Sequence, residues 1–206
     1  MKRKKTKKRS VLGFIGYGEF AGHLLDIFSD ELSQYSCVCV FDDNNQHVIE
    51  YPRFDFDAWQ EFKHKNDAFL IALGYKHMKR KTALINTMIL KNRTLLTLKH
   101  KTSIVAKSAS ISSGCILFAG SCLDSRVHLE SGVVVHNGSI LSHDVTVGAG
   151  TFIAPGVVIC GNCKIGKGCF LGAGSIVQNG VQLPDYSMVP MGEKVFRKKY
   201  RNPLCE

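Results

Sequence analysis

The segment VVVHNGSILSHDVTVGAGTFIAPGVVI, residues 133–159, belongs to a stretch with a period of six that runs from Val105 to Val189. Every sixth residue of this stretch is aliphatic, at fifteen positions without a gap. The position four places after each of the first fourteen is always small or β-branched, and the residue before that position is glycine at nine of these fourteen places. An internal repeat of this regularity outweighs local preferences for helix or strand.

A period of six matches neither the 3.6-residue period of a helix nor the two-residue alternation of a strand. It is typical of a short strand followed by a sharp corner, where the aliphatic residue fills the interior and the small residue fits between crowded backbones. Three such units make one triangular coil. The stretch therefore predicts about four to five coils of parallel β-helix, each pairing with the next, and leaves the hand of the β-helix open.

This repeat resembles that of the hexapeptide-repeat acyltransferases. The resemblance implies a left-handed β-helix over residues 101–190 and a trimer as the active form. A fold by itself names no substrate.

Residues 11–100 predict a small α/β domain, because short apolar runs alternate with segments of helical spacing. Strands are expected at Val11–Ile15, Cys37–Phe41, Ala68–Leu73 and Thr94–Leu98, and helices at Glu19–Leu32, Asp57–His64 and Lys76–Leu90. The predicted fold is thus a small Rossmann-like α/β domain followed by a left-handed parallel β-helix. A basic arm, residues 1–10, and a C-terminal tail, residues 191–206, complete the chain.

The net charge of +10 comes mainly from the first ten residues, which hold seven Lys and Arg. A basic arm could bind RNA or an acidic membrane surface, but a solvated terminus is the simpler interpretation, and no nucleic-acid partner is expected. Val11–Gly18 is not expected to be a signal peptide, because Glu19, His23 and Asp26 interrupt the apolar run and no cleavage site follows. With no stretch that could span a bilayer, we expect a cytoplasmic protein.

The eight cysteines are expected to be reduced thiols. Cys160 and Cys163 have the spacing of metal ligands, but the period sends one outward and the other inward, and a zinc site needs further ligands. No metal is expected.

The run from Gly16 to Ala21 matches G-x-G-x-x-A between a strand and a helix, and Asp42 ends the second strand, where an acid would meet a ribose. Three interpretations are open: a nucleotide-linked sugar held by its phosphates, an NAD(P) site, or a structural turn. The domain is too short for both mononucleotide-binding halves, and nothing after it resembles a hydride-transfer domain. Both facts disfavour NAD(P).

A small α/β domain joined to such a β-helix is similar to the nucleotide-sugar N-acetyltransferases of bacterial glycan synthesis. These include the bacillosamine, perosamine and viosamine enzymes, with sialic acid O-acetyltransferases as relatives. The resemblance implies acetyl-CoA as co-substrate and a nucleotide-linked amino sugar as acceptor. The residues that match the family's substrate contacts are Gly16, Tyr17, Gly18, Gly22, Asp42, Asp43, Gly74, Tyr75 and Asn137. Those that match its CoA contacts are Phe152, Gly161, Ala173 and Gly174. Phe152 replaces a histidine that is common in relatives, and the family's loop serine is absent.

Amide formation from a thioester and an amine needs a base, and histidine suits this role near neutral pH. The histidines of the repeat, His128, His136 and His143, occupy none of its inward positions. Asp144 follows His143 directly, and a carboxylate beside an imidazole can orient the ring. From the residues alone the pair is either a solvated corner or a catalytic dyad. It resembles the family's catalytic histidine and its acidic partner, which implies that His143 is the base and Asp144 supports it.

The prediction is an acetyl-CoA-dependent N-acetyltransferase that acylates an amino group, by resemblance at C4, of a nucleotide-linked deoxyamino sugar. Transfer is expected to be direct, in a ternary complex. The alternatives are a sugar or sialic acid O-acetyltransferase and a non-catalytic trimeric β-helix scaffold, while NAD(P)-dependent oxidoreduction rests on the glycine loop alone. The sequence does not name the sugar or choose among UDP, dTDP and GDP.

Overall fold

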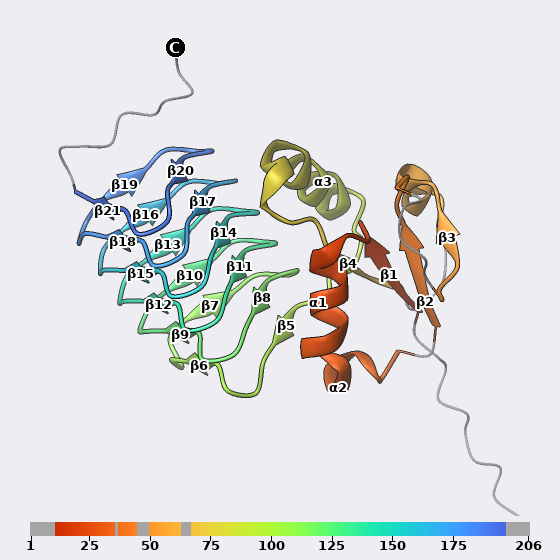
Figure 1. The fold of residues 1–206 in the computed structure, drawn as a ribbon, viewed down its shortest axis with the longest axis horizontal. Coiled ribbons are helices and arrows are strands. Elements are labelled where there is room, and N and C mark those ends of the chain that lie inside the picture. Colours follow the sequence, from red (N-terminus) through yellow and green to blue (C-terminus); the bar gives the residue numbers. More distant parts are fainter. Residues whose placement is uncertain (1–10, 36, 45–49, 63–66, 197–206) are drawn as a thin grey trace, which may run out of the picture. The chain divides into compact units, whose positions relative to one another are not determined.

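The computed structural model describes residues 11–35, 37–44, 50–62 and 67–196. The chain divides into two compact units, residues 1–73 and 74–206, which are described separately (Figure 1). The expected basic arm and residues 197–206 of the expected tail lie outside the described residues. Within the described ranges, no helix has the length and apolar character needed to cross a membrane.

The first unit is built on a parallel sheet with the strand order β3-β2-β1-β4. Its elements are β1 (Val11–Ile15), α1 (Glu19–Ile27), α2 (Ser29–Leu32), β2 (Cys37–Phe41), β3 (Arg53–Phe54), the 3₁₀ helix η1 (Phe56–Gln60) and β4 (Asp67–Ile71). Every residue of β1 is buried, which fits its unbroken apolar sequence and its central place in a parallel sheet. The strands expected here are confirmed to within one or two residues.

The helix expected over 19–32 is two helices instead. Phe28 interrupts it with φ −111° and ψ 26°, and both Phe28 and Leu32 are buried. The chain therefore bends where the Phe28 ring enters the core. The helix expected at 57–64 is the shorter η1, and residues 63 and 64 lie outside the described part of the chain.

The second unit begins with the 3₁₀ helix η2 (Tyr75–His77) and the helix α3 (Met78–Leu90), where a single helix from Lys76 was expected. α3 belongs to the same unit as the β-helix, and not to the α/β domain as expected. The reason is its close packing on two glycine corners: a Cβ added at Gly132 would lie 2.4 Å from Cδ1 of Ile85. One added at Gly150 would lie 2.8 Å from Cγ2 of Thr82.

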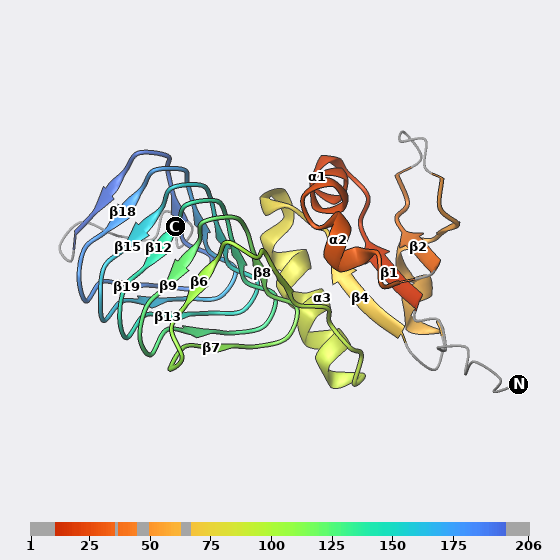
Figure 2. The same ribbon diagram turned by 90° about the horizontal axis from the view of Figure 1, so that it is seen from below.

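The rest of the second unit is a left-handed parallel β-helix whose two-residue strands form three sheets (Figures 1 and 2). The helix-covered face consists of β5 (Leu98–Lys99), β8 (Ile116–Leu117), β11 (Val134–Val135), β14 (Phe152–Ile153), β17 (Phe170–Leu171) and β20 (Met188–Val189). The apolar face consists of β6 (Ile104–Val105), β9 (Cys122–Leu123), β12 (Ile140–Leu141), β15 (Val158–Ile159), β18 (Ile176–Val177) and β21 (Lys194–Val195). The polar face consists of β7 (Ser110–Ile111), β10 (His128–Leu129), β13 (Thr146–Val147), β16 (Lys164–Ile165) and β19 (Gln182–Leu183). Paired residues such as Val134 and Phe152 are one coil apart in the chain.

The predicted interior is confirmed. The second residue of each strand points inward, and from Leu117 to Val195 these side chains are at most 4% exposed. The small residues at the corners are buried beside them, and burial raises the pKa of the Cys115 and Cys169 thiols to about 11. These cysteines therefore pack as small neutral side chains.

The β-helix has one more strand at each end than the repeat predicted. Leu98 was expected to end a strand of the α/β domain, but it begins β5 and pairs with β8. Lys99 holds the inward position of β5 and is exposed at the open end of the prism, so the aliphatic pattern did not reveal this strand. Val195 of β21 keeps the period and is 2% exposed.

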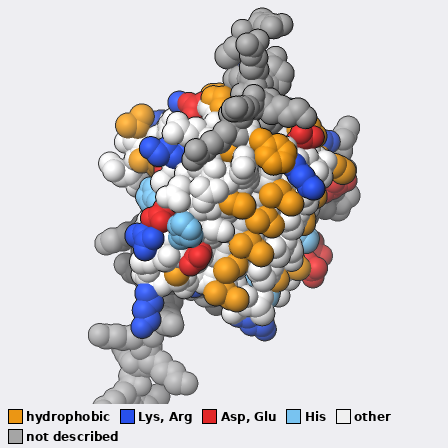
Figure 3. Space-filling model, turned by 90° about the vertical axis from the view of Figure 1, so that its left-hand side faces the viewer, with side chains coloured by type: hydrophobic (Ala, Val, Ile, Leu, Met, Phe, Trp, Pro, Cys, Tyr) orange, Lys and Arg blue, Asp and Glu red, His pale blue; other side chains and the backbone are white. Residues whose placement is uncertain are grey.

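The three faces differ in their outward residues. On the apolar face, Ile104, Ile140 and Ile176 are 65%, 43% and 38% exposed. Cys122 and Val158 lie between them and are half-buried. These five side chains form a continuous apolar column (Figure 3). The outward residues of the polar face are Ser110, His128, Thr146, Lys164 and Gln182. Only the apolar face thus exposes an unbroken line of hydrophobic residues.

Candidate active site

His143 lies at a corner of the β-helix, in the turn between β12 of the apolar face and β13 of the polar face. Its Nδ1 is 2.8 Å from Oδ2 of Asp144. Asp144 has φ 60° and holds the corner position that is glycine in most of the repeat, which directs its side chain back toward the ring. The sequence prediction that these two residues form a pair is therefore matched by the geometry.

Arg126, one coil earlier, completes this cluster. Its Nε donates a hydrogen bond to Oδ1 of Asp144 at 2.6 Å, and its Nη2 donates to Oδ2 at 2.8 Å. The guanidinium and the His143 ring together hold the pKa of the Asp144 carboxyl well below its usual range. Because the carboxylate is ionised, Nδ1 of His143 carries the shared hydrogen and Nε2 is left as a proton acceptor.

Sequence analysis missed Arg126. The sequence did hold a signal for it. Residues 18 positions apart occupy the same corner in successive coils, and Arg126 is the only charged residue besides Asp144 at the glycine position of the repeat.

Gly161 forms the floor beneath the imidazole. It lies one coil after His143, and a Cβ added to it would come within 2.6 Å of both Cε1 and Nε2 of the ring. Asn162 N–H, next to Gly161, donates to the carbonyl of His143 at 3.0 Å. Only a residue without a side chain lets the ring lie against this corner. Arg126, His143, Asp144 and Gly161 together are called the His143 corner.

Asn137, Ala173 and Gly174 lie at a different corner, where the helix-covered face meets the apolar face. Gly156 N–H donates to the carbonyl of Asn137 at 3.0 Å, and Gly174 N–H donates to that of Pro155 at 2.9 Å. These turns are therefore stacked coil upon coil, and are called the Asn137 corner. The two corners border opposite edges of the apolar face, so the predicted residues fall into two groups within a single chain.

Phe152, expected among the CoA contacts, is 6% exposed on the helix-covered face. The ring centroid of Phe152 is 5.9 Å from that of Tyr75 and 5.7 Å from Nζ of Lys81. Packing against η2 and α3 therefore occupies this side chain, and it offers little surface to a ligand.

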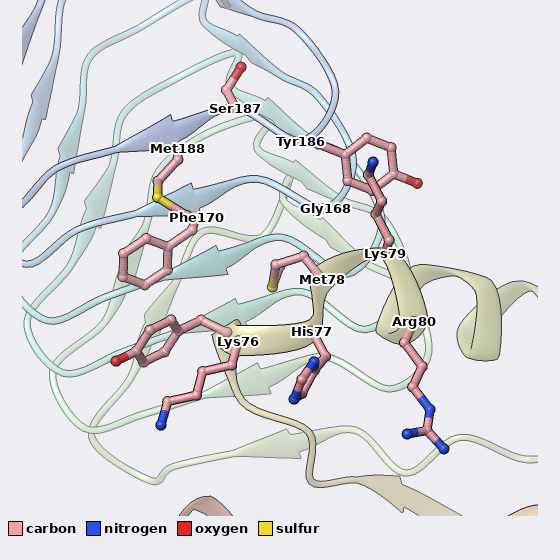
Figure 4. Close-up of a pocket in the computed structure, with 11 residues that line it drawn as sticks. Lys76, His77, Met78, Lys79, Arg80, Gly168, Phe170, Tyr186, Ser187 and Met188 are labelled. Carbon is pink, nitrogen blue, oxygen red and sulfur yellow. The ribbon is translucent and has the colours of Figure 1, made fainter. Parts of the chain in front are cut away.

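Tyr75 borders a cavity of about 420 Å³ between the start of α3 and the last coils. Its ring stacks on Phe170 with the centroids 4.6 Å apart. Phe170 and Met188 lie on one side of the cavity, and Tyr186 and Lys79 on the other (Figure 4). The remaining lining residues are Lys76, His77, Met78, Arg80, Gly168 and Ser187. The walls are apolar and aromatic, with several basic residues, a combination that suits a ligand with a planar part and a negative charge.

In the first unit, the glycine loop separates into structural and open positions. Gly16 has φ +86°, and a Cβ added to it would meet Cδ2 of Leu73 at 2.7 Å, so packing alone requires glycine. Gly18 and Gly22 have nothing within 4 Å of an added Cβ. They leave free space at the N-terminus of α1, and so does Gly74 at the start of the second unit.

The two acids after β2 hold the backbone. Oδ2 of Asp42 accepts a hydrogen bond from Tyr17 N–H at 2.5 Å, and Oδ1 accepts one from Asn44 N–H at 2.9 Å. Oδ1 of Asp43 accepts from Phe56 N–H at 2.8 Å. The amide of Tyr17 is therefore taken by a carboxylate of the chain itself.

Cys160 and Cys163 point in different directions, as the period predicted: Cys163 is buried and Cys160 half-exposed. Among the described residues, no three His, Cys, Asp or Glu side chains gather in a way that could hold a metal ion.

Comparison with known proteins bears on both units. The family model described as bacterial transferase hexapeptide (six repeats) matches residues 126–161 and 144–179. No curated protein matches the chain.

Three solved structures share the fold. The acetyltransferase domain of PglB from Neisseria gonorrhoeae is 20% identical with a TM-score of 0.79, covering 92% of each chain. PerB from Caulobacter crescentus, in complex with CoA and GDP-perosamine, is 20% identical with a TM-score of 0.78, covering 93% of this chain and 90% of that one. WeeI from Acinetobacter baumannii is 18% identical with a TM-score of 0.57, covering 92% and 98%. Residues 126–179 therefore match a hexapeptide-repeat family model, and the chain shares its fold with these three solved structures.

Proposed function

We propose that the protein is an acyltransferase that moves the acetyl group of acetyl-CoA onto an amino group, at C4, of a nucleotide-linked deoxyamino sugar. The observation that carries this proposal is the His143–Asp144 pair at an exposed corner of a hexapeptide β-helix. Support for the ligand classes comes from relatives of the same fold: the PglB domain was solved with acetyl-CoA, and PerB with CoA and GDP-perosamine.

The chemistry follows from the His143 corner. The amine nitrogen attacks the carbonyl carbon of the thioester while Nε2 of His143 accepts a proton from that nitrogen. The C–S bond then breaks, and the proton passes to the departing thiolate of CoA. Asp144 keeps the hydrogen on Nδ1 and stabilises the charged ring. The backbone amide of Gly161, next to the imidazole, is the candidate donor to the developing oxyanion.

The apolar face supports a trimer as the working form. Its column of exposed isoleucines, Ile104, Ile140 and Ile176, runs from β6 to β18, and contiguous apolar patches mark interaction sites. Three copies that turn this face toward a common axis bury the column in a closed ring.

Such a trimer would also complete the site. The His143 corner and the Asn137 corner border opposite edges of the apolar face. Around a threefold axis, one corner of each copy meets the other corner of the next. Asn137, Ala173 and Gly174 would then stand beside His143 and Gly161 of the neighbouring copy, which reunites the two groups of predicted residues.

For the acceptor, we propose that its nucleotide lies at the glycine loop of the first unit. The open space at Gly18 and Gly22 and the N-terminus of α1 suit a phosphate. Tyr17 N–H is occupied by Asp42, so phosphate contacts are assigned to the Gly18 side of the loop.

The test measures thiol release from acetyl-CoA with a panel of nucleotide-linked amino sugars and matched hydroxy sugars. We expect turnover with an amino sugar and a loss of about 10²–10⁴-fold in kcat for His143→Asn. His128→Asn, a histidine of the polar face that contacts Ser110, serves as the matched control and should keep its activity. Wild-type turnover in a folded His143→Asn variant would show that His143 is not the catalytic base. Turnover only with hydroxy sugars would show that the protein is an O-acetyltransferase.

A further inference from the structure

We infer that Arg126 is a positioning residue of this reaction, which fixes the Asp144 carboxylate so that the His143 ring presents Nε2 to the acceptor amine. The inference rests on the proposed function. It goes beyond the His143–Asp144 pair, because the hydrogen bonds of Arg126 are to Asp144 and its effect on the ring passes through that carboxylate.

The geometry is that of a two-point clamp. Nε and Nη2 of Arg126 each donate to a different oxygen of Asp144, at 2.6 and 2.8 Å. Oδ2 is also the oxygen that accepts from Nδ1 of His143, at 2.8 Å. A planar guanidinium that bonds both oxygens fixes the plane of the carboxylate, and the carboxylate in turn fixes the ring.

The backbone at this corner adds an independent observation. Arg126 and Asp144 have φ 59° and 60°, in the left-handed region that is unfavourable for a residue with a side chain. Glycine fills this position at nine of the fourteen corners of the repeat. Three successive coils carry a side chain at this position despite this cost, the third being Asn162 with φ 59°, and the side chains of Arg126 and Asp144 bond each other. Strain of this kind gathers where side chains serve a function.

The exposure of Asp144 explains why a clamp is needed. Its side chain is 34% exposed and that of His143 is 46% exposed, so neither is held by surrounding core. The His143 ring rests on Gly161 from one side only. Without Arg126 the carboxylate could rotate about its own bonds, and the ring would lose its fixed partner.

The experiment compares Arg126→Met, Arg126→Lys and Lys107→Met by kcat and KM. Lys107 is an exposed cation of the same corner column and controls for loss of charge. We expect Arg126→Met to lower kcat about tenfold or more at constant KM. Arg126→Lys, which cannot form the fork, should restore part of kcat, while Lys107→Met should match the wild type.

Two further variants separate the possible failures. Adding Arg126→Met to Asp144→Asn should cause no further loss of kcat, because Arg126 acts through Asp144. Wild-type kcat in Arg126→Met, with an inactive His143→Asn, overturns this inference alone, and so does a further loss of kcat when Arg126→Met is added to Asp144→Asn. Full activity of His143→Asn, or no acetyl transfer by the wild type, overturns the proposed function itself.

Discussion

His143 and Gly161 lie in contact across neighbouring coils, with the imidazole ring in the space that a side chain at Gly161 would fill. Gly161 is not among the residues with positive φ, so the backbone accepts alanine. The added Cβ would come 2.6 Å from Nε2, and the half-exposed ring must swing outward. We expect Gly161→Ala to lower kcat by about 10–100-fold and to change the melting temperature little, as measured by thiol release and thermal unfolding.

The control for this prediction is the same substitution in a His143→Ala background. If the methyl group acts by displacing the ring, it has nothing left to displace there, and the double variant should match His143→Ala. A further loss in the double variant would mean that Gly161 acts on acetyl-CoA directly and not through the imidazole.

A substitution at Ile140 tests the proposed trimer. It lies at the middle of the apolar column and is 43% exposed in the single chain. A carboxylate at this position would be buried unpaired in a trimer, at a cost of several kcal/mol for each copy. We expect Ile140→Glu to elute as a monomer in light scattering coupled to size exclusion, and to lose acetyl transfer because the two corners no longer meet.

The matched variant for Ile140 is Thr146→Glu. Thr146 is exposed on the polar face of the same coil, so the added charge stays in water and the trimer should persist. A wild-type protein that is monomeric at micromolar concentration would contradict the proposal that the apolar face forms the trimer interface. A trimeric Ile140→Glu variant would contradict it as well.

The interior of the β-helix was predictable because its period is set by geometry alone: one inward residue per side of a triangle. The same rule placed Leu141 and Val147 correctly without any knowledge of their neighbours. It failed at Lys99, where the open end of the prism lets a charged residue hold an inward position. Helix ends were less predictable, since the break at Phe28 depends on a ring finding the core.

The candidate site was predictable where it is local in sequence. His143 and Asp144 are adjacent, so their pairing could be read directly. Arg126 could not be, because its contact with Asp144 exists only through the stacking of coils. The grouping of Asn137 away from His143 likewise depends on which corner each residue occupies. The burial of Phe152 depends on α3, whose place against the β-helix the sequence pattern did not reveal.

Lys81 makes the β-helix unit less stable than it could be at neutral pH. Its amine is buried on α3 without a hydrogen-bond partner, and burial lowers its pKa from 10.5 to about 8. Between these pH values the unfolded chain binds more protons than the native one, so stability rises with pH across this window. The penalty at pH 7 is roughly 3 kcal/mol at most.

Lys81→Met, which keeps the length of the side chain and removes the buried charge, should raise the melting temperature at pH 7. The gain should shrink as pH rises from 8 to 10.5, because the amine is then neutral in the native state and increasingly neutral in the unfolded chain. Lys79→Met, an exposed lysine of the same helix, should change stability little at either pH. An equal gain at pH 7 and pH 10.5 would show that packing, and not desolvation of the amine, limits stability here.

Gly16 and Gly18, two residues apart in one loop, should fail in different ways when changed to alanine. Gly16→Ala forces a side chain into a left-handed conformation and against Leu73, 2.7 Å away, so we expect a loss of about 2 kcal/mol or more in the stability of the first unit. Gly18→Ala meets no atom within 4 Å and should cost under about 1 kcal/mol, as a change of helix N-cap.

If the acceptor's phosphates approach the open side of the loop, however, the methyl group added by Gly18→Ala stands in their path. Gly18→Ala should then weaken the stabilisation that a nucleotide sugar gives in thermal unfolding, while its own melting temperature stays near that of the wild type. Since a ligand raises the melting point only by binding the native state, equal ligand-induced shifts in Gly18→Ala and wild type would place the phosphates elsewhere. The loop would then be a structural turn, held by Asp42 and by the packing of Gly16 alone.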